Sequence, residues 1–261
     1  MCGIGAVILR EGNAIEFAKK ILVGQEFKGT SSSGIAYLED GEIKVFKEVK
    51  SPSQFVKDLD GIKSRVVIVH NRAPSVGRVS IENAHPFLSC DGKFALVHNG
   101  TYYGYKLLKL LLNDKHNIQG ETDAEIICHF IEEYGKMKGY STLVKSSSGQ
   151  KLILLFKDKV IGLGEFWVVK DENGIYIVQE ISVFEDMFEN QRKYVYRVDG
   201  YFEVNLNNFK LSGDVSFVGR KRFRKSEYNE LDNHTPKPWN EEEWKNRYEY
   251  GDIDKWREEW W

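Results

Sequence analysis

The chain has 261 residues, with 37 Lys and Arg against 39 Asp and Glu, so its formal net charge is -2, and 41% of its residues are hydrophobic. This length predicts one large domain or two small ones, and the hydrophobic fraction excludes wholly disordered and collagen-like chains. The near-neutral charge argues against nucleic acid as a partner. No apolar run reaches the roughly 18 residues of a membrane span, and no signal-peptide pattern is present, so we expect a cytoplasmic protein that binds no membrane.

Short apolar or alternating runs bounded by Gly, Asn and Asp predict strands, and stretches with a period of about 3.6 residues predict helices. The predicted strands, in chain order, are 3–9, 34–38, 42–46, 65–69, 94–97, 152–156, 159–163, 175–178, 194–198 and 201–204. The predicted helices are 14–27, 53–59, 105–112 and 123–136. Strands and helices do not alternate regularly, so the sequence predicts an α+β fold in which helices cover antiparallel sheets.

Short local motifs predict where several of these elements begin or end. The turns Glu39-Asp40-Gly41 and Glu172-Asn173-Gly174 are typical of hairpins. Thr122 followed by Glu125 is a capping box, which predicts that the fourth helix begins near Asp123. We expect this helix to present one apolar face, made of Ile126, Ile127, Phe130, Ile131 and Tyr134.

The character of the chain changes after Gly213. Residues 220–225 are almost all basic, and five of the six tryptophans follow them. We therefore predict a folded domain over 1–213 and a charged, Trp-rich tail over 214–261 that lacks a core of its own. Exposed tryptophans favour an interface, so we expect the tail to contact a partner or a second copy of the chain. The basic run is interpreted as a solvated strand end rather than a nucleic-acid site.

Cys2 is the cysteine with an unusual position. Removal of Met1 would leave a chain that begins with Cys2, which then carries a thiol and a free α-amine on one residue. Such an amine, with a pKa near about 8, can act as the general base for that thiol. Taken alone, the position of Cys2 is weak evidence for catalysis, because a cysteine at the start of a strand is most often an ordinary core residue.

The other two cysteines, Cys90 and Cys128, form no close pair with Cys2 or with each other. Neither they nor the histidines, including His129, show the paired spacing of metal ligands. The sequence therefore predicts no metal site and no disulfide scaffold.

Five short patches occur in an order and at a spacing that are together specific. They are Met1-Cys2-Gly3-Ile4; Lys28-Gly29-Thr30-Ser31-Ser32-Ser33-Gly34; His70-Asn71-Arg72; Glu82-Asn83-Ala84-His85-Pro86; and His98-Asn99-Gly100 followed by Glu121-Thr122-Asp123-Ala124-Glu125. Over about residues 1–205 the chain resembles the class II glutamine amidotransferases, which are N-terminal nucleophile hydrolases. The resemblance implies a four-layer αββα sandwich of two antiparallel sheets covered by helices.

The resemblance also implies roles for individual residues. Catalysis would use Cys2 as the nucleophile, with the Asn99 amide and the Gly100 N–H as the oxyanion hole. Glutamine would be bound by its α-carboxylate and its α-ammonium; the residues implied for substrate binding are Arg72, Ser75, His85 and Asp123. The alternatives without a catalytic or binding role are a plain Asn-Gly turn for Asn99 and Gly100, and a favourable helix N-terminus for Asp123.

The implied activity is hydrolysis of the glutamine side-chain amide through a γ-glutamyl thioester, without a cofactor, with the ammonia passing to an acceptor on a separate protein. Sugar-synthase members of the family read Arg-Trp-Ala-Thr-His-Gly where this chain reads Arg72-Ala73-Pro74-Ser75-Val76-Gly77. That departure keeps two alternatives open: a hydrolase for a different amide, such as a γ-glutamyl compound, or a non-catalytic binding module on the same scaffold.

Overall fold

The structure is a computed structural model that describes residues 2–112, 116–134 and 150–224. The chain divides into two units, Met1–Lys225 and Ser226–Trp261. The boundary predicted after Gly213 falls inside a strand of the first unit. Most of the predicted tail, with its five tryptophans, lies outside the described residues. Among the described residues, no helix combines the length and the apolar character needed to cross a membrane.

Eleven strands and several short helices make up the described part of the first unit. In chain order they are β1 (Gly3–Leu9), α1 (Ile15–Gly24), η1 (Glu26–Lys28), β2 (Ser32–Glu39), β3 (Glu42–Glu48), α2 (Pro52–Phe55), η2 (Val56–Leu59), β4 (Val66–Arg72), β5 (Phe87–Leu88), β6 (Phe94–Asn99), α3 (Tyr105–Leu111), α4 (Asp123–Tyr134), β7 (Lys151–Phe156), β8 (Lys159–Lys170), β9 (Gly174–Val178), α6 (Val183–Met187), β10 (Arg192–Asn205) and β11 (Lys210–Arg222).

Among the described residues, all strand pairs are antiparallel and form one continuous sheet in the order β3-β2-β4-β1-β9-β8-β7-β6-β5. Strand β10 also pairs with β8, and β11 pairs with β10. The sheet folds over on itself, so that β1 and β4 contact β6 and β7 across an apolar layer. Strand β1 illustrates the pattern, since Ile4, Ala6 and Ile8 belong to this inner core. Val7 and Leu9 alternate with them and face a second core.

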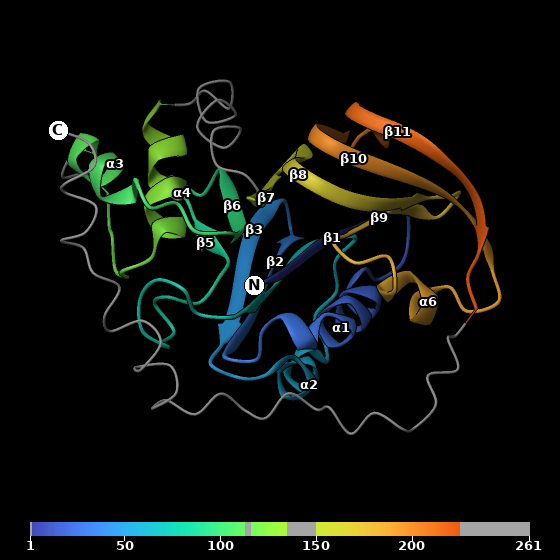
Figure 1. Cartoon of the computed structure of the whole chain (residues 1–261), viewed down its shortest axis with the longest axis horizontal. Coiled ribbons are helices and arrows are strands. Elements are labelled where there is room, and N and C mark those ends of the chain that lie inside the picture. Colours follow the sequence, from blue (N-terminus) through green and yellow to red (C-terminus); the bar gives the residue numbers. More distant parts are fainter. Residues whose placement is uncertain (1, 113–115, 135–149, 225–261) are drawn as a thin grey trace, which may run out of the picture. The chain divides into compact units, whose positions relative to one another are not determined.

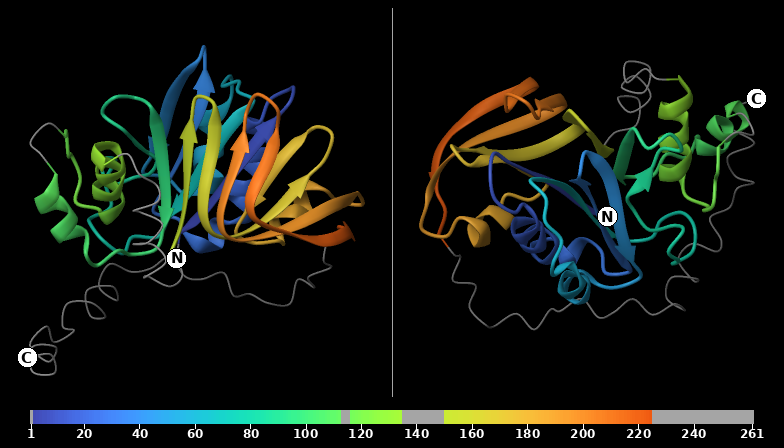
Figure 2. Two further views of the ribbon diagram at one scale, coloured as in Figure 1. Left: turned by 90° about the horizontal axis from the view of Figure 1, so that it is seen from above. Right: turned by 180° about the vertical axis from the view of Figure 1, so that it is seen from behind.

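Helices cover both outer faces. Helices α1, α2 and α6 pack on the face that carries Val7, Val69 and Tyr176, and α4 packs through Ala124 and Ile127 on the face formed by β5 to β8. Figure 1 shows α1, α2 and α6 together on one side, with α4 beside β5 and β6, and Figure 2 shows the same layers from two further directions. This arrangement confirms the predicted αββα order of layers.

Several predicted elements have different limits in the structure. The strands predicted at 194–198 and 201–204 are one strand, β10. It pairs with β8 without interruption from Tyr194 to Asn205, and its register is irregular only against β11. The helix predicted over 14–27 ends at Gly24 and is followed by the η1 turn. Helix α4 buries Ile126, Ile127 and Ile131, but Tyr134 is exposed, so the apolar face is shorter than predicted. Residues 135–136 of that predicted helix lie outside the described residues.

The predicted hairpin turns are confirmed. Asp40 and Gly41, which join β2 to β3, have φ angles of 51° and 75°. Positive φ at both central residues is the type I′ geometry that Asp-Gly favours. Gly174 opens β9 directly after the predicted Glu172-Asn173 turn, and Ile175 pairs with Lys170 of β8.

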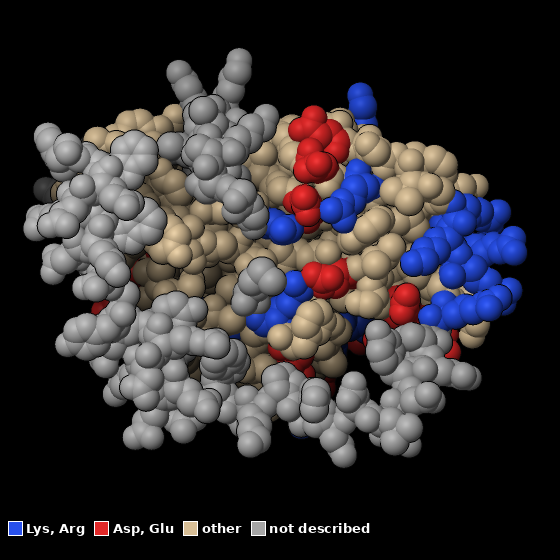
Figure 3. Space-filling view, viewed as in Figure 1, with Lys and Arg blue, Asp and Glu red and all other residues tan. Residues whose placement is uncertain are grey.

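The basic run of the sequence forms the end of an edge strand. Arg220, Lys221 and Arg222 are exposed on β11, and Lys221 pairs with Lys193 of β10. Figure 3 shows Lys and Arg side chains gathered at this side of the molecule. The basic run therefore does form an exposed strand end, as predicted.

Candidate active site

Cys2 lies at the N-terminal end of β1 with 8% of its surface exposed. Its Sγ is 3.4 Å from both the backbone nitrogen and the backbone oxygen of Ala73. Burial raises the pKa of the Cys2 thiol, and the hydrogen bond from the Ala73 backbone opposes that rise. The site therefore favours the neutral thiol while holding one N–H donor that can stabilise a thiolate.

Asn99 ends strand β6 directly opposite Cys2. Its Oδ1 accepts a hydrogen bond from the Cys2 nitrogen at 3.1 Å, and its Nδ2 has no hydrogen-bond partner among the described residues. Gly100 follows with φ 144°, and a Cβ there would lie 3.0 Å from Cγ of Gln150. A residue with a side chain would be strained at this φ angle and crowded by Gln150, so the bend after β6 requires glycine at position 100.

Arg72, at the end of β4, is 2% exposed. Its guanidinium donates to the carbonyl oxygens of Val76 at 2.8 Å, Gly77 at 3.1 Å and Arg78 at 3.0 Å. Arg72 therefore holds the loop that follows it. A guanidinium has five N–H donors, so these three bonds leave donors for a further partner.

Ser75 lies on this loop and is exposed. Its Oγ accepts a hydrogen bond from Thr101 Oγ1 at 2.9 Å. Thr101 directly follows Gly100, so this bond joins the loop after β4 to the loop after β6.

Asp123 is the first residue of α4, and it is 4% exposed. Its Oδ2 accepts a 2.7 Å hydrogen bond from the backbone of Tyr102 and lies 3.9 Å from Nδ1 of His98. The predicted cap also forms, because Thr122 Oγ1 accepts from the Glu125 nitrogen at 3.3 Å. The Glu125 carboxylate instead accepts from the backbone of residues 119 and 120, so only half of the capping box is present.

Two glycines of the second sequence patch allow close approach of backbones. A Cβ at Gly29 would overlap the backbone of Arg72, and a Cβ at Gly34 would overlap the carbonyl oxygen of His85. Ser31, between them, donates through Oγ and through its backbone nitrogen to the Arg72 carbonyl at 2.8 and 3.1 Å. The patch therefore supports the end of β4.

Asn83 joins two further patches. Its Oδ1 accepts from the Glu121 backbone at 2.7 Å, and its Nδ2 donates to the Arg78 carbonyl at 3.1 Å. That same carbonyl accepts from Arg72. The segment that leads to Asp123 is thereby tied to the loop that Arg72 holds.

The His85 side chain lies apart from the contacts described around Cys2, Arg72 and Asp123. It is 5% exposed and stacks on His70 at a centroid distance of 3.8 Å, with Phe87 at its edge. Neither ring nitrogen has a hydrogen-bond partner among the described residues, and burial holds the pKa of His85 well below its ordinary value. The structure therefore brings Cys2, Arg72, Ser75, Asn99, Gly100 and Asp123 together, and leaves the His85 ring in the interior.

Gln150 is a residue of this region that the sequence patterns did not identify. Its Oε1 lies 3.0 Å from Nε2 of His98, and its Nε2 donates to the Thr101 carbonyl at 2.8 Å. Burial lowers the pKa of His98, and nearby Asp123 opposes this shift. No motif surrounds Gln150, and its partner is 52 positions away, so only the fold could reveal it.

Several known proteins are similar to this chain. The family model of class II glutamine amidotransferases matches residues 23–256, a range that contains Arg72, Asn99 and Asp123 and begins after Cys2. The glutamine–fructose-6-phosphate aminotransferase (isomerizing) of Streptococcus agalactiae is 34% identical over 212 residues, which are 73% of this chain and 35% of that protein. The enzyme of that name from Sulfurisphaera tokodaii is 32% identical over 188 residues, or 63% of this chain and 32% of that protein.

Solved structures show the same fold at low sequence identity. Glutamine phosphoribosylpyrophosphate amidotransferase from Bacillus subtilis, in complex with ADP and GMP, has a TM-score of 0.62 and 18% identity over 85% of this chain and 49% of that chain. A structure described as the allosteric regulatory enzyme of purine biosynthesis has a TM-score of 0.63, also at 18% identity, with the same coverage. The fold is that of the N-terminal nucleophile hydrolases.

The chain belongs to the class II glutamine amidotransferases, a family of enzymes. It spans about a third of the length of each of the two aminotransferases that it matches.

Proposed function

We propose that this protein hydrolyses the side-chain amide of glutamine with Cys2 as the nucleophile. The observation that carries the proposal is the position of Cys2, whose Sγ lies 3.4 Å from the Ala73 nitrogen and whose own nitrogen bonds Asn99 at 3.1 Å. Removal of Met1 converts that nitrogen into an α-amine. The amine takes the thiol proton while the sulfur attacks the amide carbon.

The tetrahedral intermediate carries a negative oxygen, which needs hydrogen-bond donors about 2.7–3.1 Å from it. We assign this role to Nδ2 of Asn99 and the N–H of Gly100, since Oδ1 of Asn99 is occupied by Cys2. Collapse of the intermediate breaks the C–N bond, and the amine proton passes to the departing ammonia. Water then attacks the γ-glutamyl thioester, giving glutamate and restoring the thiol.

Glutamine would be held at its two charged ends. The remaining donors of Arg72 suit its α-carboxylate, with the hydroxyl of Ser75 beside them, and Asp123 suits its α-ammonium. Arg72 and Asp123 are each almost fully buried, which strengthens such charge-assisted bonds once substrate excludes water.

We propose that the ammonia passes to an acceptor bound outside the described residues, either on a separate protein or on another part of the same protein. The two aminotransferases are named for fructose 6-phosphate, and their similarity to this chain covers about a third of their length. The loop at Ala73 to Val76 differs from that of the sugar-synthase members, so a different acceptor, or a γ-glutamyl compound in place of glutamine, is the second candidate.

The test is release of glutamate from glutamine by the purified chain, with intact mass used to verify that Met1 is absent. Cys2→Ala should abolish release, whereas Cys128→Ala, which removes another buried thiol, should retain it. An electrophilic glutamine analogue should add once to the wild type and not to Cys2→Ala. Turnover of γ-glutamyl peptides alone would favour the second candidate. If protein that lacks Met1 neither turns over these substrates nor is trapped by the analogue, both candidate functions are refuted.

A further inference from the structure

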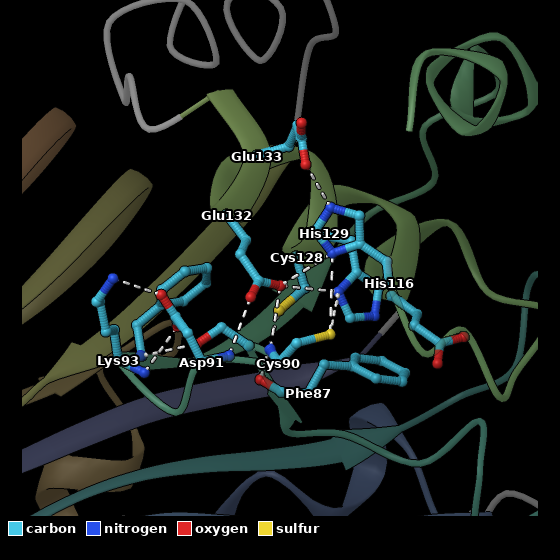
Figure 4. Close-up of polar contacts among 12 residues, drawn as sticks. Phe87, Cys90, Asp91, Lys93, His116, Cys128, His129, Glu132 and Glu133 are labelled. Atoms are coloured by element: carbon cyan, nitrogen blue, oxygen red, sulfur yellow. Dashed lines mark hydrogen bonds and ion pairs between the residues drawn. The ribbon is translucent and has the colours of Figure 1, made fainter. Parts of the chain in front are cut away.

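Four side chains outside the Cys2 site converge at one point between the β5–β6 loop and α4. They are Cys90, which follows β5, His116, which precedes α4, and His129 and Glu132, which lie within one turn of each other on α4. Each side chain offers one atom that could bind a metal ion, and these four atoms all lie within 4.8 Å of one another. Figure 4 shows the thiol, both imidazoles and the carboxylate pointing toward one another.

The separations between these atoms match the edges of a tetrahedral metal site. Cys90 Sγ lies 3.6 Å from Nδ1 of His129 and 3.8 Å from Nδ1 of His116. Glu132 Oε2 lies 3.1 and 3.3 Å from the same two nitrogens. Zinc bonds of about 2.3 Å to sulfur and about 2.0–2.1 Å to nitrogen or oxygen, at tetrahedral angles, give S···N edges of about 3.6 Å and N···O edges of about 3.3 Å.

The ligands are also oriented by outer contacts. Nε2 of His116 lies 2.8 Å from Glu133 Oε2, so its opposite nitrogen, Nδ1, is the one directed into the cluster. The Glu132 carboxylate accepts from the backbone nitrogens of Cys90 and Asp91, each at 3.0 Å. A carboxylate on the outer nitrogen of a ligating histidine is the usual support of a zinc ligand.

Hydrogen bonds among neutral side chains and carboxylates account poorly for the convergence. A neutral His116 that donates from Nε2 to Glu133 presents a lone pair at Nδ1, and this lone pair faces Glu132 Oε2 at 3.3 Å. Two acceptors at that distance repel each other. The side chains of His116 and His129 are only 6% and 4% exposed, so water screens the repulsion little. Either a proton on Nδ1 of His116 or a metal cation between the four ligand atoms removes this repulsion, and the Cys90 sulfur at 3.8 and 3.6 Å from the two Nδ1 atoms favours the metal cation.

We propose that Cys90, His116, His129 and Glu132 bind one zinc ion. A thiolate and two imidazoles select a borderline or soft metal rather than magnesium or calcium, and four protein ligands leave no open position, so the site is structural. The ion would join the β5–β6 loop, the segment before α4 and α4 itself. The same helix begins with Asp123, so the site would fix the helix that carries this residue.

The proposal departs from the sequence prediction of no metal site, and the reason is visible in the spacing. Only His129 and Glu132 are close in the chain, three positions apart. Cys90 is 39 positions from His129, and 26 from His116. No local motif results, and the fold alone assembles the set.

The experiment measures metal in the full-length protein purified without chelator and without an affinity tag that binds metal. Elemental analysis of the wild type should give about one zinc per chain. After zinc removal, added Co²⁺ should produce the visible bands of a tetrahedral site and a thiolate charge-transfer band. Cys90→Ser should lose that charge-transfer band and weaken zinc binding more than about 100-fold, and Glu133→Gln should weaken it about 10- to 100-fold.

Two other thiols supply matched controls. Cys128→Ala and Cys2→Ala should each retain one zinc and the full cobalt spectrum, and circular dichroism should verify that every variant is folded. A wild type that contains no zinc and binds neither added Zn²⁺ nor Co²⁺ at micromolar concentration overturns the proposal. Equal binding by the wild type and Cys90→Ser also overturns it, because the metal would then lie elsewhere. These readouts do not depend on glutaminase activity.

Discussion

The backbone nitrogen of Cys2 donates a hydrogen bond to Oδ1 of Asn99 across 3.1 Å. This bond fixes which way the Asn99 amide points, because its oxygen is held by the residue that carries the thiol. The Nδ2 group is consequently directed away from that nitrogen and is available as a donor. One contact thus orients the proposed oxyanion donor relative to the proposed nucleophile.

Asn99→Asp keeps the oxygen that bonds Cys2 and removes the donor. Under the proposed mechanism we expect kcat for glutamate release to fall about 10²- to 10³-fold, the usual cost of losing one oxyanion donor, with little change in KM. Asn13→Asp, remote from the site, is the control, and its rate should match that of the wild type. A rate for Asn99→Asp within a few-fold of wild type would exclude the oxyanion role.

Gly100→Ala tests the bend that follows β6. Alanine must adopt φ 144° there and bring its Cβ to 3.0 Å from Gln150 Cγ, so we expect a loss of about 2–3 kcal/mol in the free energy of unfolding and a fall in kcat. Gly12→Ala is matched, since its φ is 91° and no atom lies within 4 Å of its Cβ. It should cost about 1 kcal/mol and leave activity intact. Urea unfolding of both variants gives the comparison; equal losses would show that crowding at Gly100 is unimportant.

Asp123→Asn retains an acceptor for the Tyr102 backbone, which Oδ2 now binds at 2.7 Å, and removes the negative charge. If Asp123 binds the α-ammonium of glutamine, KM should rise about 10- to 100-fold, since a hydrogen bond to a charged group contributes about 1.5–3 kcal/mol. Steady-state kinetics at saturating glutamine should recover most of kcat. The exposed Asp199→Asn is the charge-matched control. An unchanged KM would remove Asp123 from the binding role.

Sequence patterns predicted the elements whose residues are apolar on the buried side. Strand β1 was predicted with the limits that it has, because every residue from Gly3 to Leu9 is buried and the run is apolar throughout. Only the basic end of strand β11 was anticipated. The rest was missed because most of the strand is exposed at the sheet edge, and its residues around Ser212 and Asp214 are polar. Helix α6 has only five residues, too few to display a helical period.

The site was predictable where function or close packing restricts the residue type. Gly34 and Gly100 belong to motifs because a side chain at either position would meet a neighbour. Gln150 and Gln179 could not be predicted, since each binds a group on a distant segment: His98 for Gln150, and the Ile4 nitrogen for Gln179. Such pairs are set by the folding of the sheet and leave no local pattern.

The stacked histidines beneath the site predict a loss of stability in mild acid. Burial lowers the pKa of His70 to about 3 and holds that of His85 well below its ordinary value. The unfolded chain binds protons at these residues below about pH 6.5 while the folded chain does not. The free energy of unfolding is therefore unaffected by these histidines above that pH. As the pH falls toward 3, it decreases by up to about 1.4 kcal/mol per pH unit for each histidine.

His85→Phe removes one of these groups and retains a ring to stack on His70, whose centroid is 3.8 Å away. Carboxylates also protonate in acid, so the informative quantity is the difference in slope between the two proteins. From urea unfolding between pH 6.5 and 5, we expect the free energy of unfolding of His85→Phe to fall less steeply than that of wild type. The difference in slope should approach about 1.4 kcal/mol per pH unit near pH 5, where the unfolded histidine is almost fully protonated. Values at pH 7.5 supply the reference, where neither histidine titrates. Parallel slopes would mean that His85 binds a proton in the folded protein as readily as in the unfolded chain. That result would contradict the buried, unpartnered position of its ring.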